Sequence, residues 1–476
     1  FRFAPAPRGG GRVTDGGEHM VEHRVTKVEP RLPKGMRDLL PEEMIRRRYV
    51  IEQVEAVFAA YGFEPLGTPA LELWETLMGK YGPDAEKLIY HCQHPEGRER
   101  LALRYDLSVP LARVVAMHQE LPRPFRRYQI APVWRAERPQ RGRFREFVQC
   151  DADIVGTASV QADAEILQVI CEVLGRLGFA HFVVRLNNRK ILNGLGAYAG
   201  VPATQLGGLY RAIDKLERIG LPGVEAELQR QQVPPEAIRR LLALLEVSGD
   251  PAAVLADLRR HLDGEAEALE GIAELEEILA TLDEAGVPRA RLRIEPAMVR
   301  GLEYYTGPIY ETVVEQPRIG SLTGGGRYDR LVGLFAGREV PATGTTIGIE
   351  RILEVMKAHE MFPPTLRPTT VEVLVTVFQP ELRGESLRLA QALRAGGLRC
   401  EVVLEPRSLT DQLRYANRRR IPAAVVVGPE EVRTGTVQVR HLERGEQRTV
   451  ARAEAAAAIR AWLADRGGPV GGGEAL

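Results

Sequence analysis

The sequence has little of what marks several protein classes. Its 476 residues include only four cysteines, Cys92, Cys150, Cys171 and Cys400, and no two of them form a CxxC pair. This scatter argues against a zinc site or a disulfide framework and favours a reducing compartment. No apolar run reaches the length of a membrane span, and the N-terminus lacks the apolar core of a secretory signal. We therefore expect a soluble, cytoplasmic protein.

Net charge is also absent, because 64 Lys and Arg residues balance 64 Asp and Glu residues. No overall field draws the chain to nucleic acid, so any such binding depends on local patches. The length favours about two to four domains. No Met precedes Met20, and the first 19 residues are rich in Gly, Pro and Arg. We expect a flexible leader over residues 1–30 and a flexible tail over 467–476.

A long amphipathic helix is predicted to begin at Pro41, where Glu42 and Glu43 follow in the first turn, and to end near Gly62. Further on, the segment LALRYDLSVPLARVVAMH reads as a strand, a turn and a second helix. The turn carries Asp106 and Ser108, which are well placed for contact with a ligand. Their alternative role is to cap the second helix.

The stretch from Phe125 to Gly156 places charge where a sheet is usually apolar. It reads as two strands around a basic turn. One face of the second strand is predicted to carry Arg143, Arg145, Phe147, Gln149, Asp151 and Asp153. Burial of such groups without partners is costly. The face is therefore either a solvated surface with ion pairs or a pocket for a polyanion and an ammonium group.

The segment from Asn187 to Pro288 is helical, charged and rich in Leu and Ala, which predicts an inserted helical module. Beyond it, Gly324–Gly326 either form a tight turn or let the backbone approach a ligand closely. Arg351 falls in the first turn of a predicted helix after Gly348, where the helix dipole opposes a cation. An anion bound there would resolve the conflict; otherwise the side chain reaches solvent or a carboxylate.

Strands and helices alternate again from Val371 onwards, as in VEVLVTVF, CEVVL and AAVVVG. Helices are expected near 381–395 and 409–419. This rhythm is typical of a separate α/β domain. The run Arg418–Arg420 at the end of the second helix could contact RNA phosphates or could be a solvated helix end.

Together, these segments resemble the histidyl-tRNA synthetases, which are class II aminoacyl-tRNA synthetases, over nearly all of residues 31–465. The strings RGLEYYTGPIYE and GGGRYD, which begin at Arg300 and Gly324, are similar to the two histidine-binding signatures of that family. The basic hairpin around Arg135 is similar to class II motif 2. GIER, which ends at Arg351, is similar to motif 3, and the helix ending in YGFEPLGTPALE to motif 1.

The resemblance implies an α+β catalytic domain built on a six-stranded antiparallel sheet, with a helical insertion, and a C-terminal α/β anticodon-binding domain. We expect the catalytic core at 31–365, the insertion at 187–288 and the anticodon-binding domain at 366–466. The implied reaction activates L-histidine with ATP to histidyl-adenylate and transfers the histidyl group to tRNA(His). ATP is expected with Mg²⁺, with no tightly bound prosthetic group and no side-chain metal ligand, and the chain is expected to dimerise through the motif 1 region.

Site residues are carried over from the resemblance by position. Arg135, Arg300 and Arg351 are expected to act in catalysis, with Arg300 at the reacting carboxylate and the α-phosphate. The residues expected to bind ATP are Arg135, Glu137, Arg143 and Arg351. Those expected to bind histidine are Asp106, Ser108, Gln149, Asp153, Arg300, Tyr304 and Tyr305. The basic turn from Arg138 to Arg143 is further expected to contact the acceptor end of the tRNA.

Two other functions share the resemblance. A catalytically inactive regulator, of the type of the regulatory subunit of ATP phosphoribosyltransferase, would bind histidine without activating it. Such proteins typically lack the anticodon-binding domain and lose nucleotide-binding arginines, whereas Arg135, Arg300 and Arg351 are all present here. A tRNA-sensing module of a larger regulator would need an effector segment, and the sequence contains none that we can identify.

Overall fold

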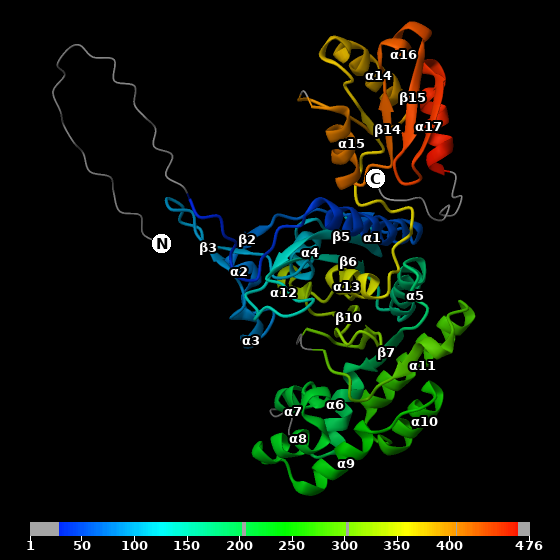
Figure 1. The fold of residues 1–476 in the computed structure, drawn as a ribbon. Coiled ribbons are helices and arrows are strands. Elements are labelled where there is room, and N and C mark those ends of the chain that lie inside the picture. Colours follow the sequence, from blue (N-terminus) through cyan, green and yellow to red (C-terminus); the bar gives the residue numbers. More distant parts are fainter. Residues whose placement is uncertain (1–27, 202–205, 301–303, 406, 465–476) are drawn as a thin grey trace, which may run out of the picture.

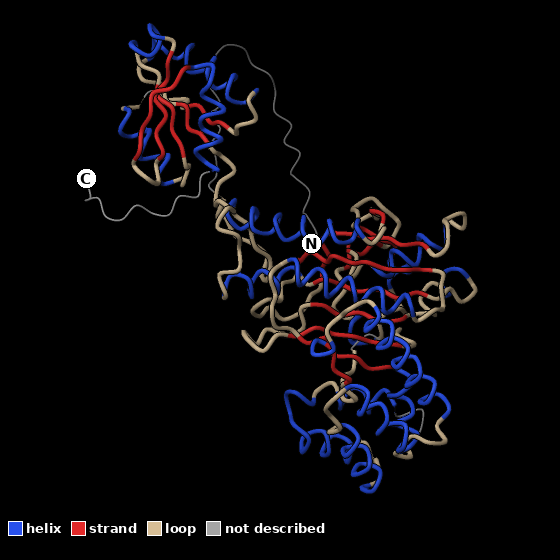
Figure 2. The backbone as a smooth tube through the Cα atoms, turned by 90° about the vertical axis from the view of Figure 1, so that its right-hand side faces the viewer, coloured by secondary structure: helices blue, strands red, loops and turns tan. Residues whose placement is uncertain are grey.

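A computed structural model describes residues 28–201, 206–300, 304–405 and 407–464. Most of the expected leader and all of the expected tail lie outside these residues. The described residues form a central body on a large sheet, an all-helical lobe at one end and a second, smaller α/β unit at the other (Figures 1 and 2). Among the helices of these residues, none combines the length and the apolar character that crossing a membrane requires.

The large sheet has eight strands in the order β1-β5-β6-β11-β10-β9-β7-β8. The six inner strands are antiparallel, whereas β1 pairs parallel with β5 and β8 pairs parallel with β7. The expected six-stranded antiparallel sheet is therefore present, extended by one short parallel strand at each edge. The strands are β1 (Glu64–Pro65), β5 (Phe125–Trp134), β6 (Glu146–Val155), β7 (Val183–Asn188), β8 (Leu292–Ile294), β9 (Pro308–Val313), β10 (Thr323–Arg327) and β11 (Ala342–Ile347).

Three helices cover the apolar face of this sheet: α1 (Pro41–Ala60), α5 (Gln161–Arg176) and α13 (Ile349–Ala358). Because side chains alternate along a strand, β6 sends Cys150, Ala152 and Ile154 into this helix-covered core. The intervening residues of β6 face the other way. The predicted α1 is confirmed, and its first turn contains Pro41 at the position where a missing N–H costs nothing.

A smaller antiparallel sheet, ordered β2-β4-β3, lies beside the body at the chain's N-terminal side. Its last strand leads into α4, which begins at Ser108, as the sequence predicts. The elements of this region are β2 (Leu71–Leu73), α2 (Trp74–Leu77), α3 (Pro83–Glu86), β3 (His91–Cys92), β4 (Leu101–Leu103) and α4 (Ser108–Met117). A short helix, α12 (Gly333–Ala336), packs against α4.

The helical lobe leaves the large sheet at the end of β7 and returns to it at β8. The sequence predicts that the helical module begins at Asn187. Asn187 and Asn188 still belong to β7, so the first helix begins two residues later, at Arg189. Asn188 joins the first and last helices of the lobe, because its side chain caps α6 and donates to the Gly271 carbonyl of α11. The helices are α6 (Arg189–Tyr198), α7 (Leu206–Ile213), α8 (Leu216–Arg230), α9 (Pro235–Leu245), α10 (Pro251–His261) and α11 (Ala266–Glu284), and the 3-10 turn η2 (Arg289–Arg291) follows.

The C-terminal unit is a five-stranded sheet in the order β13-β12-β14-β15-β16 with helices on both sides. Strand β12 lies between β13 and β14 and is parallel to both, as the βαβ rhythm predicts. The elements are β12 (Val373–Val375), η3 (Pro380–Leu382), α14 (Arg383–Ala395), β13 (Cys400–Val402), α15 (Leu409–Arg418), β14 (Ala423–Val426), α16 (Pro429–Thr434), β15 (Thr436–His441), β16 (Glu446–Ala451), η4 (Arg452–Glu454) and α17 (Ala455–Ala464).

Candidate active site

A pocket of about 450 Å³ opens on the face of the large sheet opposite α1, α5 and α13. Strands β6, β9, β10 and β11 contribute to its walls, together with the loop before α4, the turn after β5 and the start of α13. All the residues that the sequence singles out for ATP or histidine line this one pocket: Asp106, Ser108, Arg135, Glu137, Arg143, Gln149, Asp153, Arg300, Tyr304, Tyr305 and Arg351. The solvated-surface interpretation of the polar strand face is therefore wrong.

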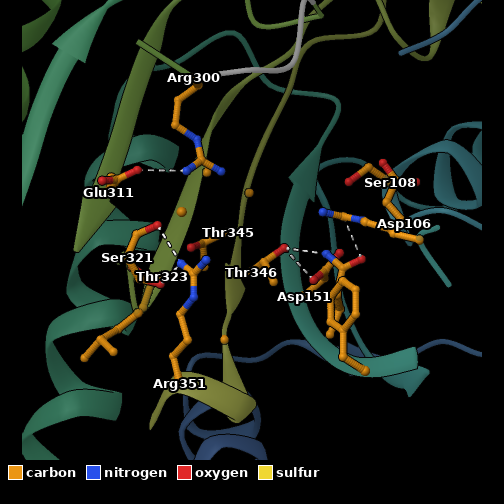
Figure 3. Close-up of a pocket in the computed structure, with 18 of the residues that line it drawn as sticks. Asp106, Ser108, Asp151, Arg300, Glu311, Ser321, Thr323, Thr345, Thr346 and Arg351 are labelled. Carbon is orange, nitrogen blue, oxygen red and sulfur yellow. Dashed lines mark hydrogen bonds and ion pairs between the residues drawn. The ribbon is translucent and has the colours of Figure 1, made fainter. Parts of the chain in front are cut away.

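One end of the pocket is cationic (Figure 3). Arg300 pairs with Glu311 at 3.1 Å, and Arg351 donates from Nη1 to the Ser321 carbonyl at 2.6 Å. Burial lowers the pKa of Arg351, and the nearby Arg143 lowers it further. Burial and a neighbouring cation both disfavour the charge on this guanidinium, and a bound anion would stabilise it. Arg351 thus follows neither of the alternatives of solvent or carboxylate, because it turns back onto a backbone carbonyl within the pocket.

A strand of glycines makes the floor beneath Arg300. Gly324–Gly326 lie inside β10, paired on both sides, so the tight-turn interpretation is wrong. A Cβ on Gly324 would lie 2.5 Å from Nη1 of Arg300, and one on Gly325 would lie 2.0 Å from the Gly344 carbonyl oxygen. The bare backbone therefore leaves room for the guanidinium.

The basic turn after β5 is tighter than the alternation predicts. Gln140 and Arg143 exchange two backbone hydrogen bonds, so β6 begins at Glu146 and not at Arg143. Arg145, expected on the polar face of the strand, donates its backbone N–H to the Gly35 carbonyl instead. Arg143 pairs with Glu137 at 3.3 Å at the mouth of the pocket.

Arg135 reaches inward from the end of β5. Its Nε donates to the Tyr105 carbonyl at 3.0 Å, and its guanidinium lies 4.4 Å above the Tyr105 ring. Its Nη2 also donates to Oε1 of Gln149 at 3.4 Å. Arg135 is thereby anchored through its stem while its charge faces the pocket.

The opposite end of the pocket is anionic (Figure 3). Asp106 accepts from the Tyr81 hydroxyl at 2.9 Å and from the Val109 N–H at 3.1 Å, so the capping interpretation is correct for this residue. Its other oxygen, Oδ2, is buried and has no hydrogen-bond partner among the described residues. Burial raises the pKa of Asp106. A carboxylate oxygen left open in this way suits a cationic ligand.

Two further carboxylates stand on β6. Asp153 pairs with the fully buried Arg127 at 2.8 Å and accepts from the Tyr328 hydroxyl. Asp151 accepts from the Thr346 hydroxyl at 2.7 Å. Burial raises the pKa of both carboxyls, that of Asp151 to about 7.

Aromatic rings close this end. Tyr304 and Tyr305 follow the undescribed residues 301–303, and their ring centroids are 4.9 Å apart. Tyr328 lies 5.8 Å from Tyr304 in an edge-on arrangement. Burial raises the pKa of all three phenols, so they remain hydrogen-bonding neutral groups.

Sequence reasoning missed several polar residues of this pocket. Asp151 was visible on the same strand face as Gln149 and Asp153, and that face was the available signal. Other missed residues are brought in by strand pairing: Arg127 is in register with Asp153, Thr346 with Asp151, and Glu311 with Gly324. A local sequence pattern does not predict partners that are brought together by pairing between distant strands.

An antiparallel sheet with arginines over a glycine strand at one end and buried carboxylates at the other defines a class II aminoacyl-tRNA synthetase. Residues 35–352 match the family model described as histidyl-tRNA synthetase, and residues 372–462 match the model described as anticodon binding domain. The chain therefore belongs to the histidyl-tRNA synthetase family.

Individual relatives agree with this assignment. A histidine–tRNA ligase of Aeropyrum pernix is 44% identical over 436 residues, which cover 90% of this chain and 98% of the relative. The crystal structure of a histidyl-tRNA synthetase from a Nostoc species matches with a TM-score of 0.81 and 33% identity, covering 92% of this chain and all of that one. A structure from Bacillus halodurans, described as an ATP phosphoribosyltransferase regulatory subunit/histidyl-tRNA synthetase, matches at 22% identity and a TM-score of 0.68, a likeness of fold alone.

Proposed function

We propose that the pocket activates L-histidine with ATP and that the chain then transfers the histidyl group to tRNA(His), the reaction of its family. One observation carries the proposal: a single pocket holds Arg300 and Arg351 at one end, the open carboxylate oxygen of Asp106 at the other, and Arg135 anchored on the Tyr105 carbonyl next to Asp106. A substrate that joins a polyanion to an amino acid would present matching charges to both ends.

Activation needs positioning more than it needs a base. The carboxylate oxygen of histidine attacks the α-phosphorus of ATP, the bond from that phosphorus to the bridging oxygen breaks, and pyrophosphate leaves. Cations aimed at the phosphoryl oxygens stabilise the charge that develops. In the proposal, Arg300 contacts the reacting carboxylate and the α-phosphate, Arg135 and Arg351 hold the phosphates, and Glu137 and Arg143 help to fix the nucleotide. Guanidinium forks suit phosphate oxygens well.

The anionic end is proposed to bind the amino acid. Asp106, Ser108, Gln149 and Asp153 surround its ammonium group, while Tyr304 and Tyr305 address the imidazole. Support comes from the burial of Asp106, Gln149 and Asp153, since a buried polar site strongly rejects ligands that leave it unpaired. Mg²⁺ is proposed to enter with ATP. It is commonly held by substrate phosphates with one or two carboxylates, and Glu311 and Glu137 line the same pocket.

Two surfaces are proposed for the tRNA. Arg141, in the turn Arg138–Arg143, is two-thirds exposed and pairs with Glu354 at 3.3 Å, so most of its guanidinium is accessible to the acceptor end. The arginines of α15 are proposed to contact the anticodon arm. The proposed domains remain 31–365, with 187–288 inserted, and 366–466. Separate sheets in the two support this division.

A homodimer through the motif 1 region is also proposed. Leu71 and Leu73 on β2 are large apolar side chains that are exposed in the single chain. Leu40, which precedes α1, is exposed as well. Burying them against a second copy would remove apolar surface from water. A cytoplasmic location is proposed as well, supported by four cysteines that form no disulfide.

Histidine-dependent exchange between ATP and pyrophosphate tests the proposal. Exchange is expected with histidine and with no other amino acid. Arg300→Ala is expected to reduce the exchange rate by about 10³-fold, because it removes a donor aimed at the developing charge. Binding of histidine without exchange in the wild-type protein would instead identify a regulator of the ATP phosphoribosyltransferase type.

A further inference from the structure

A chain of hydrogen bonds runs through the pocket from Arg135 to Asp151. Arg135 donates from Nη2 to Oε1 of Gln149 at 3.4 Å, and Gln149 donates from Nε2 to Oγ1 of Thr346 at 3.1 Å. The Thr346 hydroxyl then donates to Oδ1 of Asp151 at 2.7 Å (Figure 3). Gln149 and Asp151 are both buried.

The chemistry of its two ends fixes the direction of this chain. A guanidinium can only donate, and an ionised carboxylate can only accept. The Thr346 hydroxyl must therefore donate its hydrogen bond to Asp151. A lone pair of the same hydroxyl oxygen then accepts from the amide N–H of Gln149. The amide oxygen of Gln149 then faces Arg135 and the pocket.

The two ends contribute unequally. The contact between Arg135 and Gln149 is long, whereas that between Thr346 and Asp151 is short and ends on a charge. Short, charge-assisted hydrogen bonds are the stronger ones. The orientation of Gln149 is thus set mainly from the Asp151 end.

We propose that Asp151 is a positioning residue, which acts through Thr346 to hold the Gln149 amide with its oxygen toward the substrate ammonium group. The inference rests on the proposed function, in which Gln149 contacts that ammonium. We call the hydrogen bonds from Gln149 to Thr346 and from Thr346 to Asp151 the relay. Without it, the Gln149 amide could turn over and present its NH₂ group to two cations, the ammonium and Arg135. Two N–H donors facing two cations would repel both.

Burial raises the pKa of Asp151 to about 7, and the charge of the fully buried Arg127 on the neighbouring strand opposes this shift. The carboxyl is therefore mostly ionised at about pH 8, where it can only accept a hydrogen bond. Thr346 is the β11 residue in register with Asp151, so the backbone ladder itself holds the donor in place.

Two imidazole ligands provide the test, one with the ammonium group and no carboxylate, and one with a carboxylate and no ammonium group. Histidinol carries the imidazole and the ammonium, whereas 3-(imidazol-4-yl)propionate carries the imidazole without the ammonium. Their dissociation constants are measured by calorimetry at pH 8 for the wild-type protein, Thr346→Val, Thr346→Ser and Asp151→Asn. Valine keeps the volume of threonine and loses the hydroxyl, and serine keeps the hydroxyl.

Thr346→Val is expected to weaken histidinol binding by about tenfold or more, the scale of a lost hydrogen bond to a charged group. It is expected to leave the propionate within about twofold, and Thr346→Ser is expected to bind histidinol within about twofold of wild type. An equal loss for both ligands, or none for either, would overturn the relay. A loss in Asp151→Asn without one in Thr346→Val would overturn it too, in favour of direct contact between Asp151 and the ligand. Failure of the wild-type protein to bind histidinol would overturn the proposed function itself.

Discussion

The two sheets of this molecule follow opposite rules. In the C-terminal sheet, every residue of β12 and β14 is buried and apolar. In the large sheet, β6 buries apolar side chains on one face and Gln149, Asp151 and Asp153 on the other. Two polar atoms that line or adjoin the pocket, Asp106 Oδ2 and Arg300 Nε, are buried and find no hydrogen-bond partner in the described part of the chain. Such atoms are costly unless something binds them.

The two domains therefore differ in where their polar residues lie relative to the sheet. The large sheet forms part of the wall of the pocket, so the candidate site appears in the sequence as charge where a sheet should be apolar. In the C-terminal sheet, β12 and β14 bury apolar side chains alone, and the surface arginines of this unit lie outside those two strands. On α15 and the loop before it, Arg407, Asp411, Arg414, Asn417 and Arg418 surround an open hollow on the surface. Surface arginines of this kind look alike in a sequence whether or not they bind RNA.

Among the changes that compare the two sheets, the largest effect is expected from adding one methyl group to the strand of glycines beneath Arg300. In Gly324→Ala, the new Cβ would lie 2.5 Å from Nη1 of Arg300, so the guanidinium must shift. A misplacement of about 1 Å can cost about 10²-fold in rate, and we expect a loss of that order in pyrophosphate exchange. The melting temperature should stay close to wild type, because the clash involves only the far end of a side chain.

The matched control is Gly384→Ala in α14 of the C-terminal unit, where the nearest atom to the new Cβ is 3.7 Å away. This variant should exchange pyrophosphate at the wild-type rate. If the two alanine variants behaved alike, the two sheets would not differ in the way described.

A smaller effect is expected at the other end of the molecule. Replacing Arg414 and Arg418 with serine should raise the KM for tRNA(His) in aminoacylation by about tenfold and reduce the salt dependence of tRNA binding by about two phosphate contacts. Pyrophosphate exchange should not change. Arg388→Ser, an exposed arginine on α14 of the same unit, serves as the control. Equal effects from both sets of substitutions would indicate a general charge effect instead of a binding surface.

The smallest expected effect is a pH dependence confined to the large sheet. Asp151 faces Arg127 on β5, Asp153 on β6, Asp106 before α4 and the Thr346 hydroxyl on β11. With its pKa raised to about 7, it should lose its charge as pH falls through that value, and the KM for histidine should rise a few-fold between about pH 8.5 and 6.

Asp151→Asn should lack this component of the profile, and the difference between the two profiles removes the titration of the substrate itself. The effect on stability has the opposite sign. A carboxyl whose pKa is raised on folding stabilises the protein below its unfolded pKa and loses that contribution as pH rises toward about 7. In the C-terminal sheet, burial lowers the pKa of His441, which favours its neutral form. A profile that was unchanged in Asp151→Asn would contradict the assignment.

Much of the catalytic site could be predicted because its motifs are local. The alternation along β6 correctly separated Gln149, Asp151 and Asp153 from the apolar residues between them. The strand order could not be predicted in this way, since the pairing of β6 with β11 joins distant segments of the chain. For the same reason Thr346 and Arg127 were missed, although each is in register with a carboxylate that the pattern contained.

Two local interpretations failed for physical reasons. Gly324–Gly326 suggested a turn, because glycine is common in turns, but the strand needs bare backbone under Arg300 and beside β11. The start of β6 was placed three residues too early, because the alternation continues through Arg143 while the chain is still turning. A pattern of alternating side chains does not reveal where pairing begins.

The order of the strands also bears on how the protein is made. Strand β6 ends at Val155 and its partner β11 begins at Ala342, so the ribosome adds roughly 190 residues, taking about 10–40 s, before the β5–β6 hairpin can be covered. The α1 and α5 helices are synthesised early enough to cover its apolar face. The other face of the hairpin stays exposed to water during this time, and the amide and the carboxylates of β6 on that face are readily solvated. Charged side chains beside an unpaired strand edge discourage its pairing with other chains, so the polar residues of β6 would also protect this edge during synthesis.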